Sequence, residues 1–263
     1  RWAWTRSKSA YARRTWAVTG DRIVPHFFVN GHPLGSVLPA TQIERHFSCR
    51  VEAGGAIDCV DIIKNGKLFR RFSELDQVPS KPSGMVETLI TLELGWGEKH
   101  KSSHWEVELE LTAGEITRIE PRFRGLEVVS PVEKKYGAEH GYHTCRWEKE
   151  GDRKVRLEVE SYGNPTNSTP TTQNFCLHVK MPHDAAVRAK LNHVRETIPL
   201  TRLLEGVYTG HLGLIDSPAY RFNRAPLKHE YDWSFDFTDR DSAPAYYYLR
   251  VRQKNDQWAW CSP

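Results

Sequence analysis

Short runs in which polar and apolar residues alternate recur along most of the chain. Successive side chains of a β-strand point to opposite faces, so a period of two places every second residue on one side of a sheet. In residues 104–111, one side collects Trp105, Val107, Leu109 and Leu111, and glutamates occupy the positions between them. One dry and one wet face is typical of a strand in an antiparallel sheet. The pattern therefore predicts a mainly β protein.

Turn-forming residues divide these runs into separate strands. The strongest signal is Lys64-Asn65-Gly66-Lys67, because Asn-Gly accepts the positive φ angles of a type I′ turn. We expect a hairpin of residues 57–63 and 68–72 around it. Further strands are expected at 23–29, 45–51, 87–94, 116–123, 142–147, 155–159, 174–179, 229–237, 246–251 and 258–260. Residues 7–18 predict a short N-terminal helix that leads into a short strand, and residues 184–195 fit either a short helix or a strand.

A cluster of Pro, Ser and Gly at residues 79–84 divides the chain. We expect four strands before this cluster and three after residue 227, and seven is the strand number of an immunoglobulin-like sandwich. The expected fold is thus an antiparallel immunoglobulin-like β-sandwich of residues 21–83 and 227–263, with residues 84–226 as a large β-rich insertion. It predicts that the strand near Arg45 pairs with a strand near Tyr231 or Tyr248.

Composition and charge limit the class of protein. Of 263 residues, 39% are hydrophobic, which is enough for a packed core, and no run approaches the roughly 18 apolar residues of a membrane helix. The net charge is +4, but cations and acids are interspersed, and the densest cationic patch, Arg118, Arg122 and Arg124, has acidic neighbours. Nucleic-acid binders concentrate their cations on one stripe, so we expect neither a membrane span nor a nucleic-acid partner. The chain starts at Arg1 and ends in an apolar aromatic segment, which suggests a piece of a longer polypeptide and leaves its compartment undetermined.

The five cysteines form no CxxC motif, and Cys49 and Cys59 are expected on adjacent strands as unpaired thiols packed like small apolar residues. Among the twelve histidines, His100 and His104 stand four apart in a polar turn, and His140 and His143 lie beside Glu139 in another expected loop. Solvated loop histidines are the favoured interpretation, with a metal site as the alternative.

Motifs for covalent or phosphate chemistry are absent from the sequence. There is no Gly-x-Ser-x-Gly, and Gly31 to Gly35 lacks the Lys-Ser/Thr continuation of a phosphate loop. We predict no catalytic residue and no metal ligand.

Nine tryptophans raise the alternative of carbohydrate binding, because an exposed flat ring stacks on a sugar face. Trp96 lies between Gly95 and Gly97, which indicates a loop and not a packed strand. Most other tryptophans fall in alternating patterns where core packing is expected. Trp96 is therefore the candidate residue for a carbohydrate partner.

Three parts of the sequence carry a resemblance to a known family: residues 12–23, residues 57–66, and the terminal residues 246–253 and 257–263. Together with Trp96-Gly97 and residues 120–125 and 217–226, they resemble the C-terminal part of bacterial proteins whose preceding domain is similar to PHP-type metal-dependent phosphoesterases. The resemblance covers nearly the whole chain.

The resemblance implies that residues 1–20 are the tail of a preceding PHP-like domain, which would be the partner of this chain and would hold divalent metal ions on its own His and Asp ligands. No cofactor is implied for the present residues. Arg13 and Arg14 would approach an anionic substrate of that domain, since guanidinium suits phosphate or carboxylate; a helix end with salt bridges to its neighbours is the alternative. The expected function is a non-catalytic accessory β-sandwich, with a carbohydrate-binding module or an unrecognised hydrolase as alternatives.

Overall fold

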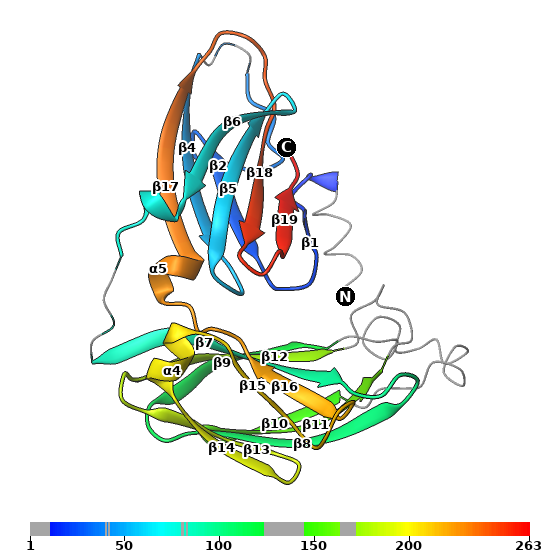
Figure 1. Ribbon diagram of the computed structural model, residues 1–263. Coiled ribbons are helices and arrows are strands. Elements are labelled where there is room, and N and C mark those ends of the chain that lie inside the picture. The colour runs from blue at the N-terminus through cyan, green and yellow to red at the C-terminus, as the bar shows by residue number, and fades with distance from the viewer. Residues whose placement is uncertain are drawn as a thin grey trace. The chain divides into compact units, whose positions relative to one another are not determined.

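The computed structural model describes residues 11–39, 41, 43–79, 82, 84–123, 145–163 and 172–263. Strands paired in antiparallel sheets make up most of it, and the described helices are short, so the prediction of a mainly β protein is confirmed (Figure 1). The chain forms two compact units. Unit 1 comprises Arg1–Ser80 and Lys228–Pro263, and unit 2 comprises Lys81–Leu227.

Unit 1 contains a five-stranded sheet in the order β1-β19-β18-β5-β6 and a four-stranded sheet in the order β17-β4-β2-β3. A 3-10 turn, η1 (Glu74–Asp76), and the short helix α5 (Lys228–Tyr231) complete its described elements. The strands are β1 (Trp16–Val18), β2 (Val24–Val29), β3 (His32–Pro33), β4 (Glu44–Glu52), β5 (Ile57–Lys64), β6 (Lys67–Ser73), β17 (Asp232–Arg240), β18 (Tyr247–Gln253) and β19 (Trp258–Cys261).

Two strand pairings predicted from the sequence are confirmed in unit 1. Strands β5 and β6 form the expected hairpin, and Asn65 and Gly66 adopt φ angles of 51° and 77° at its turn. Strand β4 pairs with β17, so that Arg45 lies opposite Asp239. Trp16–Val18, which the resemblance assigned to the tail of a preceding domain, is hydrogen-bonded to β19 as strand β1.

Aromatic side chains fill much of the core of unit 1. Alternation along β4 buries Phe47, Cys49 and Val51 as expected. The Phe47 ring lies 4.4 Å from that of Phe237 with an interplanar angle of 4°, and Trp233 on the same sheet is fully buried. Stacked rings and β-branched side chains therefore supply most of the apolar area that stabilises this unit.

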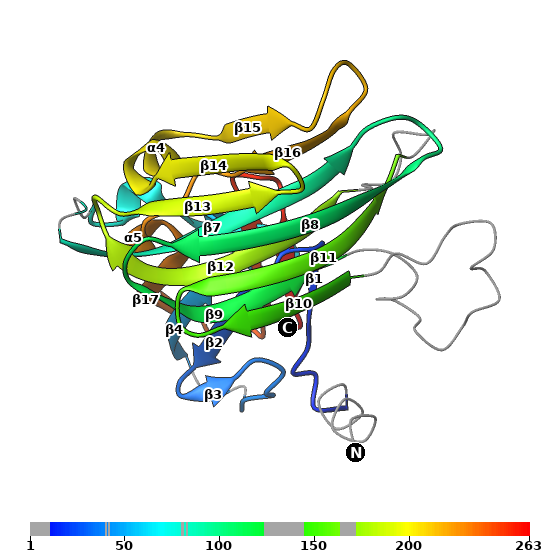
Figure 2. The ribbon, with the colours of Figure 1, turned by 90° about the horizontal axis from the view of Figure 1, so that it is seen from below.

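Unit 2 is a second pair of antiparallel sheets, each of five strands (Figure 2). Their orders are β10-β11-β8-β13-β14 and β15-β16-β7-β12-β9, and the helix α4 (Leu200–Glu205) follows β14. The strands are β7 (Met85–Trp96), β8 (Ser102–Leu111), β9 (Glu115–Arg122), β10 (Cys145–Glu150), β11 (Lys154–Tyr162), β12 (Gln173–Pro182), β13 (Ala186–Leu191), β14 (Val194–Pro199), β15 (Tyr208–His211) and β16 (Pro218–Phe222).

The core of unit 2 contains the apolar face of β8, which the sequence predicts to be buried. Trp105, Val107, Leu109 and Leu111 are all buried in one cluster with side chains of β7, β11, β12 and β13. The indole nitrogen of Trp105 donates a hydrogen bond of 2.9 Å to Ser161 Oγ, which satisfies the polar atom of an otherwise apolar side chain.

Several expectations need correction. Of the expected N-terminal helix, the described part retains Tyr11 alone in helical conformation, and residues 7–10 lie outside it. The undecided segment 184–195 belongs to a β-hairpin, β13–β14, which turns at Asn192 with φ 55°. Cys49 and Cys59 are unpaired thiols, but their strands, β4 and β5, belong to different sheets and are not adjacent. In the described part of the chain, helices are too short and too polar to cross a membrane.

Candidate functional site

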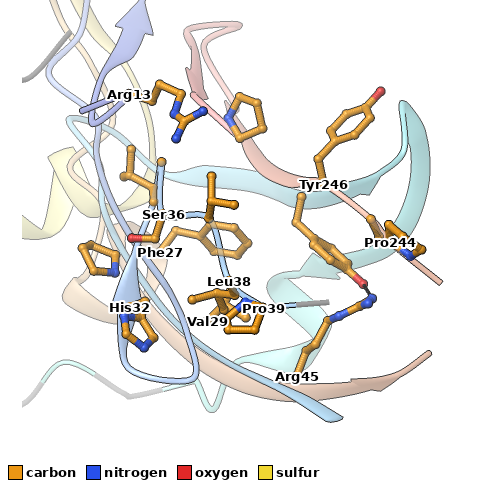
Figure 3. A pocket seen from close by; sticks show the side chains of 17 residues that line it. Arg13, Phe27, Val29, His32, Ser36, Leu38, Pro39, Arg45, Pro244 and Tyr246 are labelled. Carbon is orange, nitrogen blue, oxygen red and sulfur yellow. Dashed lines mark hydrogen bonds between the residues drawn. The ribbon is translucent and has the colours of Figure 1, made fainter. Parts of the chain in front are cut away.

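Unit 1 contains a cavity of about 420 Å³, a size typical of small-molecule sites (Figure 3). Apolar side chains that include Phe27, Val29, Leu38 and Pro39 form much of its wall. The remaining lining comes from Arg13, from β3 and the loop after it, from Arg45 on β4, from residues 244–247 before and at the start of β18, and from Pro263. Segments far apart in the sequence thus meet at one cavity.

The β2–β3 hairpin is held in place by its turn. Asn30 and Gly31 have φ angles of 49° and 78°, as a type I′ turn requires. The Asn30 side chain accepts a hydrogen bond of 2.8 Å from the backbone N–H of His46 and donates one of 3.2 Å to the carbonyl of Glu44. These bonds tie the turn to β4, and alternation along β2 then directs Phe27 inward.

Gly35 brings the N-terminal segment against the pocket loop. Its φ is 79°, and a Cβ there would lie 2.5 Å from the carbonyl oxygens of both Ala12 and Arg13. Only glycine, which has no Cβ, allows the two backbones to come this close. The close passage of the two backbones positions Arg13 at the cavity.

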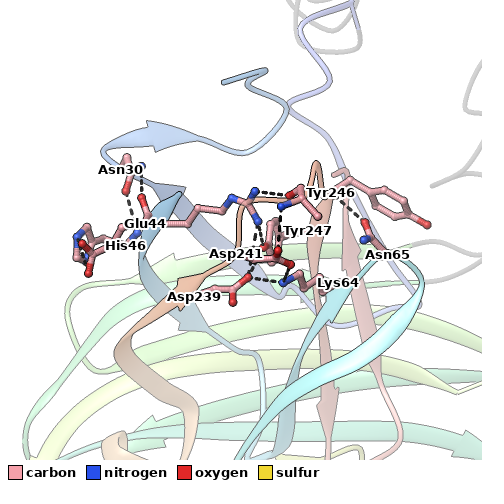
Figure 4. A network of polar contacts seen from close by, with 11 residues as sticks. Asn30, Glu44, His46, Lys64, Asn65, Asp239, Asp241, Tyr246 and Tyr247 are labelled. Atoms are coloured by element: carbon pink, nitrogen blue, oxygen red, sulfur yellow. Dashed lines mark hydrogen bonds and ion pairs between the residues drawn. The ribbon is translucent and has the colours of Figure 1, made fainter. Parts of the chain in front are cut away.

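A polar network extends from Arg45 on the cavity wall (Figure 4). Arg45 donates hydrogen bonds of 2.6 Å to the hydroxyl of Tyr247 and to the carbonyl of Ala243. The Tyr247 hydroxyl in turn donates to Asp239, which also accepts a bond of 2.6 Å from Lys64 Nζ. Lys64 donates a second bond, of 2.7 Å, to Asp241. Two cations and two carboxylates therefore balance one another beside the cavity.

The network fixes the charge state of its members. Burial opposes the charge on Lys64, but hydrogen bonds to Asp239 and Asp241 outweigh it and raise the Lys64 pKa. Burial likewise opposes the charge on Asp239, but the bonds from Lys64 and Tyr247 lower its pKa overall. Burial and the neighbouring carboxylate raise the pKa of Tyr247. The pKa values of Lys64 and Tyr247 are thus raised further above 7, and that of Asp239 is lowered further below 7. Each group therefore keeps one protonation state near pH 7.

The residues predicted from the sequence differ in their relation to the cavity. Arg13 and Arg14 are both exposed, but only Arg13 lines the cavity, and Trp96 belongs to unit 2. Sequence reasoning missed Arg45. The alternation along β4 could have identified it. Arg45 is two residues from the buried Phe47 and therefore points to the same apolar face, where a cation requires a buried partner.

Trp96 is the last residue of β7 and pairs with Pro218, so the expectation of a loop position is wrong. Its exposed fraction is 41%, and its φ is 56°. The guanidinium carbon of Arg221 lies 5.5 Å from the ring centroid, as in a cation–π contact. One face of the indole is therefore next to a cation.

In unit 2, Glu120, Cys176 and His178 place potential ligand atoms within 4.8 Å of one another. Two guanidinium groups occupy the same place: Arg118 lies 2.7 Å and Arg122 lies 3.1 Å from the Glu120 carboxylate. Burial opposes the charge of Glu120, but His178 and Arg122 outweigh it and lower its pKa to about 2. A metal ion would meet two fixed cations there, so the arrangement is suited to an ion-pair network. His140, His143 and Glu139 lie outside the described residues.

No family model matches this chain, and no solved structure matches it. An uncharacterized protein of Chlamydia pneumoniae and one of Chlamydia muridarum are each 34% identical to it over 70 residues. The similarity covers 25% of this chain and 11% of each relative, so the chain matches about a tenth of the length of these proteins.

Proposed function

We propose that this chain is a non-catalytic accessory β module that binds a ligand in the cavity of unit 1. The supporting observation is a largely apolar cavity beside a network whose charges are balanced and whose pKa values move away from neutrality. General acid–base catalysis favours a pKa near the working pH, whereas a network of paired charges at the wall suits binding.

The larger protein in this proposal carries a PHP-like metal-dependent phosphoesterase domain before Arg1, with this chain as its accessory part. The resemblance of residues 12–23, 57–66, 246–253 and 257–263 supports it. The sequence that precedes Arg1 is the test: His and Asp motifs of the PHP type are expected there, and their absence would contradict this part of the proposal.

Unit 1 belongs, in the same proposal, to the immunoglobulin-like sandwiches. Labelled in chain order, β2, β4 and β17 take the places of strands A, B and E, and β6, β5, β18 and β19 take those of C′, C, F and G. The two sheets contain these strands in the neighbour order of that fold. Solved relatives of unit 1 with another strand order would contradict the assignment.

A turnover assay separates binding from catalysis. The purified chain, incubated with phosphomonoesters and phosphodiesters and with added Mn²⁺ or Zn²⁺, is expected to release no product above the rate in buffer. Stoichiometric metal uptake together with metal-dependent turnover would show that the chain is a hydrolase and would overturn the proposal.

A carbohydrate-binding module is the second candidate, supported by the exposure of Trp96. It predicts glycan-array or calorimetric binding that Trp96→Ala abolishes. Trp147→Ala is the matched control, because Trp147 lies in the same unit and is 43% exposed, close to the 41% of Trp96. Equal loss of binding in both variants, or no glycan binding by the chain, would remove this candidate.

A further inference from the structure

We propose that the cavity of unit 1 binds a small organic carboxylate with an apolar body, and that Arg13 is the residue that binds the carboxylate group. The inference rests on the proposed binding function and names the class of ligand. It follows from the charge of the lining, from the apolar wall between the charges, and from the way Arg13 is held.

The side chains that line the cavity include basic groups and no acidic group. Arg13, Arg45 and His32 are its basic residues, and none of the lining residues is Asp or Glu. The charge of Arg45 is already balanced, since its Nη1 lies 3.7 Å from Asp239 and donates to Tyr247. For Arg13, no hydrogen bond or ion pair joins its side chain to the rest of the chain that the structure describes. Its guanidinium retains the donors that grip a carboxylate in a two-bond fork.

The wall selects an anion with an apolar body. In Figure 3, Arg13 and Arg45 lie on opposite sides of the cavity, with Phe27, Val29 and Leu38 between them. A phosphate dianion would lose more hydration there than a hydrocarbon wall and one unpaired cation can replace. A monocarboxylate leaves its single charge on Arg13 and buries an aliphatic or aromatic body against the wall, which is favourable by about 25 cal/mol per Å² of apolar area.

The backbone at Arg13 is held in place, although its side chain is exposed. Its backbone has φ 56°, and it passes so close to Gly35 that a methyl group cannot fit between them. On the other side, Asn65 accepts a hydrogen bond of 3.0 Å from the backbone N–H of Tyr246 and fixes the start of the lining segment at β18. Because the backbone on both sides of the cavity is already ordered, ligand binding loses little free energy to ordering of the lining.

Calorimetric titration of the full chain with 3-phenylpropionate and with octanoate tests the inference. Both acids are expected to bind, and 3-phenylpropanol, which lacks the charge, is expected to bind at least about tenfold more weakly, because a hydrogen bond to a charged group contributes about 1.5–3 kcal/mol. Inorganic phosphate is expected to bind more weakly than either acid.

The variant Arg13→Gln is expected to weaken binding of both acids at least about tenfold. Arg14→Gln removes the same charge from the next residue, which is exposed and does not line the cavity, and should leave affinity unchanged. Leu38→Trp fills the cavity and should abolish binding of acid and alcohol alike, while thermal unfolding reports whether each variant is folded.

Equal losses in Arg13→Gln and Arg14→Gln would indicate a general electrostatic effect and would overturn the role of Arg13. Equal affinity for the acid and the alcohol, or tighter binding of phosphate, would overturn the ligand class. Lack of binding by every probe would overturn the inference as well. The proposed non-catalytic role fails by a different result, turnover by the chain, so the two failures are distinguishable.

Discussion

Asp61 is a buried carboxylate on β5, between β18 and β6 in the five-stranded sheet of unit 1. It has an exposed fraction of 1% and accepts hydrogen bonds from Arg71 on β6 and Arg250 on β18, at 2.7 Å for the shortest contact in each case. Burial opposes its charge, but the two arginines outweigh that effect and lower the Asp61 pKa. Three neighbouring strands thus share one ionised side chain.

We expect Asp61→Asn to lower the free energy of unfolding at pH 7 by about 1–3 kcal/mol, because two charged hydrogen bonds lose their acceptor charge. A carboxyl with a depressed folded pKa stabilises the fold above its unfolded pKa of about 4, and this contribution disappears as the pH falls through the folded value. The difference between wild type and variant should therefore shrink below about pH 4. Chemical denaturation from pH 7 to pH 3 measures it.

Asp58→Asn is the matched control, since Asp58 is on the same strand but its side chain is 44% exposed and lies 3.7 Å from Arg252. It should change stability little at any pH, as exposed ion pairs contribute little. A difference for Asp61→Asn that stays constant down to pH 3 would contradict the assigned pKa shift.

Among the elements, the turn between β8 and β9 shows how one residue type limits the packing of strands. Gly114 has φ 92°, and a Cβ there would lie 2.3 Å from the carbonyl oxygen of Lys180 and 2.6 Å from the Cα of Met181. Both contacts are with the backbone of β12, which cannot move without breaking its pairing with β7 and β9. The turn is therefore packed directly on a central strand of its sheet.

We expect Gly114→Ala to destabilise unit 2 well beyond the roughly 1 kcal/mol that a positive φ angle alone costs a non-glycine residue. Gly151→Ala is the matched control, because Gly151 also has a positive φ of 65° but no atom lies within 4 Å of the place that its new methyl group would take. Thermal unfolding of the two variants measures the difference. Similar losses in both would mean that strain at φ, and not contact with β12, determines the cost.

For the whole molecule, the main feature is that sheet formation stays within each unit. Every described strand pairing joins two strands of the same unit, and the apolar cluster of unit 2 contains no residue of unit 1. Unit 1 is discontinuous in sequence, whereas Lys81–Leu227 is one continuous stretch. Each unit therefore has its own core and its own hydrogen-bonded sheets.

We expect a fragment of residues 81–227 to fold by itself, because its core and both of its sheets are complete without the remainder. Its circular dichroism should be that of a β protein, and it should unfold in one cooperative step. Residues 1–80 expressed alone provide the contrast. Without β17, β18 and β19, strand β1 loses its described partner and β4 and β5 each lose one of two, so this fragment should remain unfolded. An unfolded 81–227 fragment would contradict the independence of unit 2.

The sequence by itself determined the local features of this protein. Period-two alternation located most strands, and Asn65-Gly66 located a hairpin, because side-chain direction and φ depend on a few neighbouring residues. Segment 184–195 stayed ambiguous for the same reason: its strand β13 is decided by pairing with β8, about 80 residues away. The short β3 carries too few residues for any periodic signal.

The tertiary structure alone decided which residues share a site. Arg13 reaches the cavity because Gly35 lets two distant backbones meet, and Arg45 faces Tyr247 across about 200 residues of sequence. Arg14, which the sequence offered on the same grounds as Arg13, is not part of the cavity lining, and Trp96 belongs to the other unit. Neighbours in space are determined by how strands assemble into sheets, and that depends on packing summed over the whole unit, so no local pattern contains it.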